Sequence, residues 1–568
     1  MADNHDLKVL RHSAAHLLAQ AVSELFPNTK LTIGPATEEG FFYDFLPERN
    51  FRDEDLPAIT ARMQELVKKD LKLEHKEISK TEARELYKNN QFKLELIDNL
   101  PGDTVGLSTQ GDFYDLCRGG HVKSTGELAN FKLQNISGAY WRADREGQAL
   151  QRISGTAFFT TQDLAEYELR REEALKYDHR KLGREMDLFS FHDEGPGFPF
   201  FHPKGKIIIN KLVEELRKLR LAKNYDEIST PIILSDELWR RSGHYQHYRE
   251  NMYFCQIDEQ NYAIKPMNCP GSILVFKTRP RSYRELPLRL SEFGLVHRHE
   301  LSGVLHGLFR VRAFTQDDCH TYCTVDQIEN EIVEIIKIAQ YVFGKYGFAN
   351  LDIAVSTKPA KSLGTEAVWA QATTALENAL QQANLPYRIQ PGEGAFYGPK
   401  IEFKIKDSMG REWQCGTIQV DFFQAENFDL SYISAEGKKE RPVIIHHVIY
   451  GSLERFLGIL LEHHKGWLPF SLAPVQLRVL TITDKQQHYA AQIVDQLRAA
   501  NLRAELDPSS DPLSGKIKNA QLDRIPYTVI VGDKEMEKNT VTIRHHHGQQ
   551  EQNLTISELL KKAESLLK

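Results

Sequence analysis

The stretches "EFGLVHRHELSG", residues 292–303, and "LFRVRAFTQDDCH", residues 308–320, decide the fold of the central part of the chain. Apolar and polar residues are interleaved in both, so we expect a strand, a loop and a second strand. Arg298, Arg310 and Arg312 stand among the apolar residues at strand spacing. Arginines that rise from a sheet into a cleft suit polyphosphate binding, because the guanidinium fork meets two phosphate oxygens. The alternative is a set of ordinary salt bridges on the sheet surface.

The flanking segments continue a mixed pattern of helix and strand. Residues 206–234, "KIIINKLVEELRKLRLAKNYDEISTPIIL", predict a long helix, a turn and a strand closed by Pro231. Residues 442–464, "PVIIHHVIYGSLERFLGILLEHH", predict a strand that runs into a helix. Arg455 stands at the start of that helix and is a second candidate for binding phosphate.

The chain is long enough for three or four domains, with 568 residues of which 41% are hydrophobic and 26% charged. An amphipathic helix and short strand-like runs come first, and a highly charged segment without proline then predicts a linker helix. Strands alternate with helices near the C-terminus, which predicts parallel pairing there. We expect an α+β multidomain protein whose N-terminal domain, linker helix, central domain and C-terminal α/β domain span residues 1–160, 161–186, 187–468 and 469–568.

Composition narrows the class of protein. No run of about 18 apolar residues is present, so no membrane contact is expected, and the N-terminus lacks the basic leader and apolar core of a secretory signal. Six cysteines in a chain of this length do not make a disulfide framework, so we expect a cytoplasmic location. The net charge of −6 neither predicts nor excludes a nucleic-acid partner, because phosphate binding depends on local basic patches.

Two pairs of potential metal ligands lie in the N-terminal part. His12 and His16 are four apart in a predicted helix, and Cys117 and His121 are four apart again. By spacing alone, four such residues predict a structural zinc site. The alternative is a reactive pocket that needs several imidazoles and a thiol.

Together these pieces resemble a known family. "KNYDEISTPI", "HRHE" and "GSLERF" resemble, in order and spacing, the three motifs of class II aminoacyl-tRNA synthetases. "MNCPGS", "RVRAFTQDDCH", "GEGAFYGPKIEF" and "WQCGTIQVDF" are similar to strings of the threonyl-tRNA synthetase family, and the resemblance covers essentially the whole chain. It implies an antiparallel-sheet catalytic core, an N-terminal editing domain and a C-terminal anticodon-binding domain.

The implied activity is the ATP-dependent ligation of L-threonine to tRNA(Thr) by way of threonyl-adenylate, in a homodimer. The resemblance implies that Arg298 holds the ATP α-phosphate and that Arg455 meets the γ-phosphate. Glu300 would contact the adenine amino group, and Arg310 and Mg²⁺ would neutralise further phosphate charge. The other implied residues are Asp318 and Tyr397 for the threonine amino group, Met267, Gln316 and Gln414 for the pocket wall, Lys400 and Gln419 near the reacting carboxylate, His244 for transfer to the tRNA ribose, and Lys518 and Glu535 for the anticodon.

The family carries one zinc ion per subunit, and the matching positions here are Cys269, His320 and His446. Three protein ligands leave a position open for substrate. Such an ion would reject valine, which lacks the hydroxyl, but serine loses only a methyl group, worth about 1–3 kcal/mol. The local cluster in "DDCHTYC" would have favoured Cys319 and Cys323 as ligands, and the resemblance implies instead that these two are core or neighbouring residues.

A zinc-based selector therefore needs a second site that hydrolyses seryl-tRNA(Thr). The resemblance places this editing site at His12, His16, Cys117 and His121, with Asp115 as a further polar residue. It implies a pocket without metal, in which these side chains position water and the ribose ester for general acid–base attack. The structural-zinc interpretation stays as the alternative.

The chain departs from the family pattern in two places. The usual bacterial member has a small ubiquitin-like domain ahead of the editing domain, and here the sequence starts almost at the editing helix. Residues 544–547, "RHHH", are rich in histidine where permanent charge is expected, which weakens phosphate attraction at pH 7. A catalytically silent paralogue and another class II ligase, such as the prolyl enzyme, are the competing interpretations. The intact arginines disfavour the first, and the zinc triad and editing domain disfavour the second.

Overall fold

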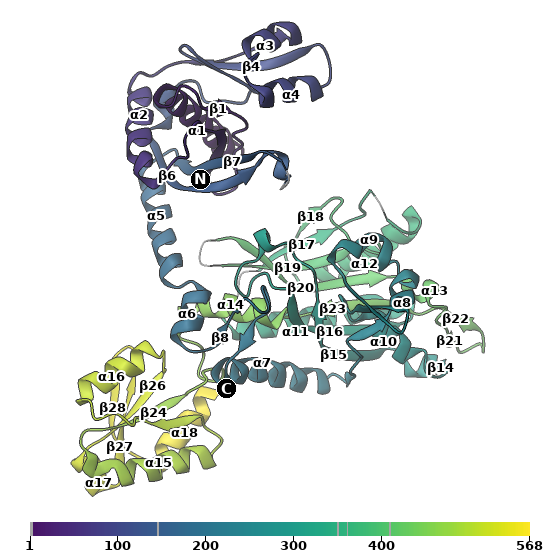
Figure 1. Cartoon of the computed structure of the whole chain (residues 1–568). Helices are drawn as coiled ribbons and strands as arrows, with labels where there is room; N and C mark the ends of the chain where they lie inside the picture. Colours follow the sequence, from purple (N-terminus) through teal and green to yellow (C-terminus); the bar gives the residue numbers. More distant parts are fainter. Residues whose placement is uncertain (1–3, 145–146, 349–350, 361, 408–409, 568) are drawn as a thin grey trace. The chain divides into compact units, whose positions relative to one another are not determined.

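The structure is a computed structural model that describes residues 4–144, 147–348, 351–360, 362–407 and 410–567 (Figure 1). The chain divides into two compact units, Met1–Glu172 and Glu173–Lys568, called here the N-terminal unit and the larger unit. Among the described residues, no helix combines the length and the hydropathy needed to cross a membrane.

The N-terminal unit is built around α1 (Asn4–Leu25). Leu10, Ala14, Leu17, Leu18 and Ala21 recur on one face at helical spacing and are fully buried. Together with α2 (Leu56–Lys68), this face of α1 packs against a sheet of strand order β1-β2-β7-β6. The strands are β1 (Lys30–Leu31), β2 (Phe41–Leu46), β6 (Asn130–Tyr140) and β7 (Ala149–Phe158).

A second small sheet of order β3-β4-β5 completes the N-terminal unit. Its strands are β3 (Leu73–Ser79), β4 (Thr104–Gln110) and β5 (Phe113–Leu116), and it shares a core with α3 (Lys80–Leu86) and α4 (Gln91–Asn99). The strand β5 ends at Leu116, so the loop that follows carries Cys117 and His121.

The segment expected as one linker helix forms two helices. α5 (Thr161–Lys176) ends before Tyr177, and α6 (His179–Glu185) begins after Asp178. The Asp178 carboxylate accepts a hydrogen bond from the backbone N–H of Arg180, so it caps a new helix N-terminus. The prediction of a single helix is therefore wrong at this point, because a capping residue interrupts an otherwise helical run.

The larger unit contains an eight-stranded sheet of order β10-β15-β16-β23-β20-β19-β17-β18. The pairs β10–β15 and β17–β18 are parallel and the other neighbours are antiparallel, so the expected antiparallel core is confirmed. The strands are β10 (Asp226–Glu227), β15 (Leu288–His297), β16 (Ala313–Cys323), β17 (Asp352–Ser356), β18 (Arg388–Gln390), β19 (Lys400–Lys406), β20 (Glu412–Asp421) and β23 (Val443–Val448).

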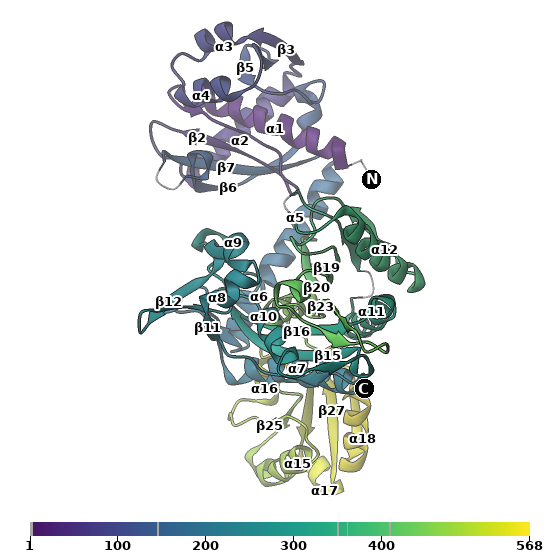
Figure 2. The ribbon, with the colours of Figure 1, turned by 90° about the vertical axis from the view of Figure 1, so that its right-hand side faces the viewer.

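Helices with strongly apolar faces cover this sheet and share its main core. They are α7 (Pro203–Leu221), α11 (Ile328–Lys345), α12 (Glu366–Gln382) and α14 (Leu453–His463). α11 and α12 lie side by side (Figure 2). Cys319 and Cys323 belong to this core, which agrees with their expected place among core residues.

Smaller elements surround the main sheet. They are β8 (Phe189–Ser190), β9 (Phe200–Phe201), β11 (Ile233–Ser235), β12 (Tyr253–Ile257), β13 (Gln260–Ile264), β14 (Arg281–Ser282), β21 (Tyr432–Ile433), β22 (Lys439–Glu440), α8 (Asp236–Arg241), α9 (His244–Tyr248), α10 (Cys269–Phe276) and α13 (Gln424–Asn427). α10 begins within the "MNCPGS" string at Cys269, and Pro270 is well tolerated in this first turn.

The C-terminal part folds around a sheet of order β25-β24-β26-β27-β28 (Figure 1). β24 pairs in parallel with β25 and β26, as expected, but β27 and β28 join by antiparallel pairing, so the expectation of parallel strands is wrong for these two. A short connection from β26 through α17 allows the chain to return beside β26 in the opposite direction. The elements are β24 (Leu477–Thr481), β25 (Ala504–Leu506), β26 (Tyr527–Val531), β27 (Thr540–His545), β28 (Gln550–Thr555), α15 (Gln487–Ala499), α16 (Leu513–Leu522), α17 (Asp533–Lys538) and α18 (Ile556–Leu567).

Candidate functional site

Strand register brings distant residues of the larger unit into one row. His320 of β16 lies opposite His446 of β23, and His446 lies opposite Gln419 of β20. Directly opposite residues of an antiparallel sheet point to the same face. These three side chains therefore face one side of the sheet although they span 126 positions of the sequence, from 320 to 446.

That face of the sheet forms the floor of a cavity of about 420 Å³. Most of the predicted aminoacylation residues line it: His244, Met267, Cys269, Arg298, Glu300, Arg310, Gln316, Asp318, His320, Tyr397, Gln414, Gln419, His446 and Arg455. Lys400 is not among the lining residues, and its ammonium group instead forms an ion pair with Glu402 at 2.5 Å. The sequence did not single out Phe309 and Phe314, which also line the cavity and offer apolar faces beside the arginines.

Three arginines enter this cavity, Arg298 and Arg310 from the loop between β15 and β16 and Arg455 from the first turn of α14. Arg298 Nε donates to the Pro266 carbonyl at 3.2 Å, and Arg455 Nε donates to the Phe309 carbonyl at 2.9 Å. Within the described part of the chain, neither guanidinium forms an ion pair with a carboxylate. Burial, together with the charges of Arg298 and Arg310, lowers the pKa of Arg455. An excess of positive charge in a partly closed cavity favours an anion.

Arg310 and Glu300 are engaged with each other. Arg310 Nε donates to Glu300 Oε2 at 3.0 Å, so both side chains must exchange partners if they are to contact a nucleotide. Arg312 donates to the Glu300 and Pro196 carbonyls and thereby holds the loop between β15 and β16. The salt-bridge interpretation thus applies to Arg310, and the cavity contains Arg298 and Arg455 as uncompensated cations.

Asp318 is a buried carboxylate that lines the cavity. Burial raises its pKa to about 6, although Asn268 Nδ2 donates to it at 3.2 Å. A carboxylate held above its ordinary pKa by burial is stabilised by an incoming ammonium group. Tyr397 donates its hydroxyl hydrogen to Gln419 Oε1 at 2.6 Å, which orients the amide beside the same space.

Cys269, His320 and His446 form a cluster whose ligand atoms lie within 4.8 Å of one another, and all three are buried. Burial lowers the pKa of His320 well below its ordinary value, so its imidazole is neutral, as metal binding requires. His320 Nε2 is buried without a hydrogen-bond partner among the described residues. His446 Nε2 lies 3.1 Å from Asp421 Oδ2, the kind of carboxylate contact that orients histidine ligands.

His244 is fully buried at the start of α9. Its Nδ1 lies 2.8 Å from Ser242 Oγ, and its Nε2 lies 3.0 Å from Met267 Sδ. Burial lowers the pKa of His244 to about 3, so the ring is neutral near pH 7. A neutral imidazole keeps an unprotonated nitrogen that can accept a hydrogen bond from a hydroxyl that enters the cavity.

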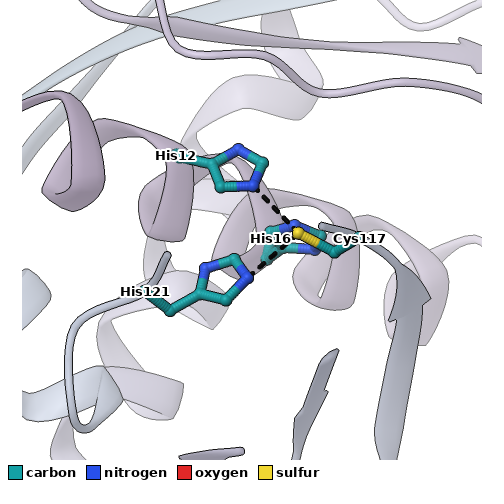
Figure 3. Close-up of side chains that lie close together, drawn as sticks. All are labelled: His12, His16, Cys117 and His121. Atoms are coloured by element: carbon teal, nitrogen blue, oxygen red, sulfur yellow. Dashed lines mark hydrogen bonds between the residues drawn. The ribbon is translucent and has the colours of Figure 1, made fainter. Parts of the chain in front are cut away.

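The four residues singled out in the N-terminal unit do converge. His12 and His16 lie one turn apart on α1, and Cys117 and His121 come from the loop after β5 (Figure 3). The Cys117 sulfur lies 3.0 Å from His12 Nε2 and 3.1 Å from His121 Nε2. His16 Nδ1 lies 3.3 Å from Asp115 Oδ2.

Asp115 has two further partners that the sequence did not single out. Lys93 Nζ lies 2.5 Å from Asp115 Oδ1, and Tyr43 donates its hydroxyl to Asp115 Oδ2 at 2.6 Å. Lys93 is 2% exposed, which is rare for a lysine without a paired carboxylate. The sequence contained one signal of this burial. Lys93 stands four residues before the buried Ile97 and therefore lies on the apolar face of α4.

These contacts favour a negative charge on Cys117 and a positive charge on His16. Burial alone would raise the pKa of Cys117, but hydrogen bonds with His12 and His121 and the charge of His16 outweigh it and lower that pKa strongly. Burial would lower the pKa of His16, but Asp115 and Cys117 raise it to about 9. The favoured state near neutral pH is a thiolate beside an imidazolium. Such a set can polarise water, and it could also hold a metal ion.

The two predicted anticodon residues lie in the C-terminal part of the larger unit. Lys518 is exposed on α16. Glu535 accepts hydrogen bonds from the Gly532 backbone N–H and from Thr542 Oγ1, both at 3.0 Å, so it already stabilises the start of α17. In the histidine-rich turn, burial lowers the pKa of His546 to about 4, which leaves it neutral as expected.

Three family models match the chain. They are described as "tRNA synthetase class II core domain (G, H, P, S and T)" over residues 253–464, "Anticodon binding domain" over residues 476–566 and "Threonyl and Alanyl tRNA synthetase second additional domain" over residues 105–154. With the antiparallel sheet and its arginine-lined cavity, these matches define a class II aminoacyl-tRNA synthetase.

Similar proteins identify one family within the class II aminoacyl-tRNA synthetases. The threonine–tRNA ligase of Caldanaerobacter subterraneus subsp. tengcongensis is 53% identical over 545 residues, which cover 95% of this chain and 84% of that protein. That of Carboxydothermus hydrogenoformans is 52% identical over 545 residues, 95% of this chain and 86% of that protein. A crystal structure of the RNA binding domain of threonyl-tRNA synthetase from Cryptosporidium parvum Iowa II superposes with a TM-score of 0.67 at 41% identity, over 68% of this chain and 98% of that one. The chain belongs to the threonyl-tRNA synthetase family: it is a threonine–tRNA ligase with an editing domain.

Proposed function

We propose that this ligase works with two separate sites, one that activates and transfers threonine and one that hydrolyses seryl-tRNA(Thr). The single observation that best supports the proposal is the cavity of the larger unit, which combines uncompensated arginines with a buried Cys/His cluster. The arginines suit the negative charge of a polyphosphate, and the Cys/His cluster suits the selection of a small polar amino acid. A ligase that joins the two needs both features side by side.

Arg298 and Arg455 are proposed to bind the triphosphate of ATP together with Mg²⁺. Both line the cavity, and we assign Arg298 to the charge that develops on the α-phosphate as the threonine carboxylate attacks and Arg455 to the γ-phosphate. Glu300 and Arg310 are assigned to the adenine amino group and to further phosphate contact. Lys400 keeps its predicted role near the carboxylate only if it leaves Glu402.

Zinc is proposed to be held by Cys269, His320 and His446, one ion per subunit. The buried, unpartnered Nε2 of His320 and the thiol-and-two-imidazole donor set fit this metal. A bound zinc ion would supply an open position for the amino and hydroxyl groups of the substrate. Asp318 and Tyr397 are assigned to the amino group, and Met267, Gln316, Gln414 and Gln419 complete the pocket.

His244 is proposed to act in transfer of threonine to the tRNA ribose. Its neutral, buried imidazole lines the same cavity, and its Nε2 lies close to the pocket residue Met267. Proton removal from a ribose hydroxyl is a role that suits a neutral imidazole.

Hydrolysis of seryl-tRNA(Thr) is proposed for the N-terminal pocket. His12, His16 and His121 surround the Cys117 sulfur, and Asp115 orients His16. No covalent step is needed to cleave an activated ester, so Cys117 is assigned to charge and orientation. A structural zinc ion held by the same four residues is the alternative that the experiments below separate.

We assign the oligomeric state, the anticodon contacts and the cellular location from the family pattern. Exposed apolar residues at and after the end of α7, among them Leu221 and Ile233, support a homodimer built on this segment. Lys518 and Glu535 are assigned to the anticodon of tRNA(Thr). The domain boundaries at 160, 186 and 468 and a cytoplasmic location complete the proposal.

An ATP–pyrophosphate exchange panel over the twenty amino acids tests the proposal. Threonine should support the fastest exchange, serine a slower one, and valine none above background. Equal rates with valine and threonine would contradict a polar selector in the cavity.

A further inference from the structure

His179 is a fully buried histidine at the first position of α6, outside the residues assigned above. Its Nδ1 lies 2.8 Å from Glu462 Oε1 of α14, and the same carboxylate accepts from the His179 backbone N–H at 3.2 Å. On its other side, His179 Nε2 accepts a hydrogen bond from the Leu308 backbone N–H at 3.0 Å. Because Nε2 accepts, the ring proton is on Nδ1 and is donated to Glu462.

The segment that His179 contacts leads directly into the ATP cavity. The His179 ring packs on Phe309, with ring centroids 4.2 Å apart, and Phe309 and Arg310 line the cavity. Gly307 approaches so closely that a Cβ there would lie 2.2 Å from His179 Nε2. Gly307 also has a φ of +48°, so this turn requires glycine for two reasons.

α14 holds this segment at two points. Arg455 donates directly to the Phe309 carbonyl, and Glu462 reaches Leu308 through His179. Residues 455 and 462 are seven apart, or about two helical turns, and so lie on the same face of α14. The two backbone groups fixed in this way belong to adjacent residues, which restrains the position from which Arg310 enters the cavity.

We propose that His179 is a positioning residue that, fixed by Glu462, holds the Leu308–Arg310 segment in the conformation that binds ATP. The inference rests on the proposed assignment of Arg310 and Arg455 to ATP. It extends that assignment to α6, which contributes no residue to the cavity. In this proposal α6 acts on ATP binding only through the backbone of the Leu308–Arg310 segment.

Two substitutions separate the two hydrogen bonds of His179. In His179→Asn the amide can still donate to Glu462, but its acceptor no longer reaches Leu308. In His179→Gln the side-chain oxygen reaches about as far as Nε2 and can still accept from Leu308. His464→Asn is a matched control, because His464 is a half-buried histidine just after α14 whose Nε2 lies 3.2 Å from the Tyr346 carbonyl, and it does not line the cavity.

The measurement is threonine-dependent ATP–pyrophosphate exchange with the full-length chain, with KM determined for ATP and for threonine. His179→Asn should raise KM for ATP roughly 5- to 30-fold, as expected for one buried N–H left without an acceptor, with KM for threonine within about two-fold. His179→Gln should restore KM for ATP to within about three-fold of the wild type, and His464→Asn should leave both constants unchanged. His179→Phe keeps the ring on Phe309 but lacks the acceptor, so it should repeat the rise and covers the case in which the asparagine variant does not fold.

Several results would overturn the proposal. They are an unchanged KM for ATP in the asparagine or phenylalanine variant, an equal rise in both KM values, or a glutamine variant no better than the asparagine variant. Absence of threonine-dependent exchange in the wild type would instead contradict the proposed function.

Discussion

His320 and His446 face each other across two neighbouring strands, with ring centroids 4.9 Å apart. The β16–β23 register is what places them together, and Cys269 reaches the same point from the first turn of α10. The cluster therefore depends on the sheet for its geometry, and the sheet does not depend on the cluster, because the main core of the larger unit is made of other residues.

Removal of one donor should abolish threonine selection and leave the fold intact. We expect Cys269→Ala to contain no zinc and to lose threonine activation by about 100-fold or more, because loss of a group that only supports a ligand already costs about 10- to 100-fold, while the circular dichroism spectrum stays unchanged. Cys255→Ala is the matched control, because Cys255 lies on β12 outside the cavity. Wild-type protein that contains no zinc and still activates threonine would contradict the assignment.

The sequence alone could not identify this cluster. Cys319 and Cys323 stand beside His320 in the chain, but residues at odd separation on a strand point to opposite faces, so both cysteines enter the core behind the sheet. The true neighbours of His320 come from positions 269 and 446, which only the sheet register and the start of α10 bring together. The family resemblance supplied what the spacing could not.

The sequence did predict larger features of the fold. The strand–loop–strand around Arg298 and the strand-to-helix segment 442–464, whose helix begins beside Arg455, formed as their patterns predict. Lys93 was missed because a lysine on the apolar face of a helix is usually solvated through its long side chain, and the sequence does not show that Asp115 lies beside it. The antiparallel course of β27 was missed because alternation of helix and strand does not determine the direction of a terminal strand.

Loss of Lys93 should destabilise the N-terminal unit. Lys93→Met leaves the Asp115 carboxylate buried without its ammonium partner, which costs about 3–5 kcal/mol. Thermal denaturation followed by circular dichroism should show a lowered transition for this unit. The control Lys68→Met alters an exposed lysine of α2 and should change stability by less than about 0.5 kcal/mol. Equal transitions in the two variants would contradict a buried ion pair.

Glu454 should make the stability of the larger unit depend on pH. Burial raises the pKa of Glu454 to about 7, from an ordinary value of 4.5. A group whose pKa is raised in the folded state contributes stability that is fully present below 4.5 and is lost as the pH rises to about 7. Relative to Glu454→Gln, the wild type should therefore lose up to about 1.4 kcal/mol per pH unit in this window and nothing more above it. Urea midpoints between pH 4.5 and 8.5 measure this difference, and a constant or opposite difference would refute it.

A charge on the proposed dimer surface should separate the subunits. Ile233 is 49% exposed at the start of β11, and Ile257 is 48% exposed on β12. Ile233→Glu should give a monomer by light scattering with reduced exchange activity, because a buried charge opposes association. Ile257→Glu is the matched control and should stay dimeric. A fully active wild-type monomer would contradict the dimer itself.

The separation of synthesis from editing is the central claim, and His12 and His16 provide its most direct test. His12→Ala with His16→Ala removes two of the three imidazoles around Cys117 and touches no residue of the larger unit's cavity. Two quantities are measured on the same protein: the rate of threonyl-tRNA(Thr) formation, and the seryl-tRNA(Thr) that accumulates when serine replaces threonine. Zinc per chain is determined in parallel.

We predict that threonyl-tRNA formation stays within a few-fold of the wild type, that seryl-tRNA(Thr) accumulates only in the double variant, and that both proteins contain one zinc ion per chain. Two zinc ions per wild-type chain, with an unfolded N-terminal unit in the variant, would show instead that the four residues hold a structural metal, and the account of editing would be contradicted.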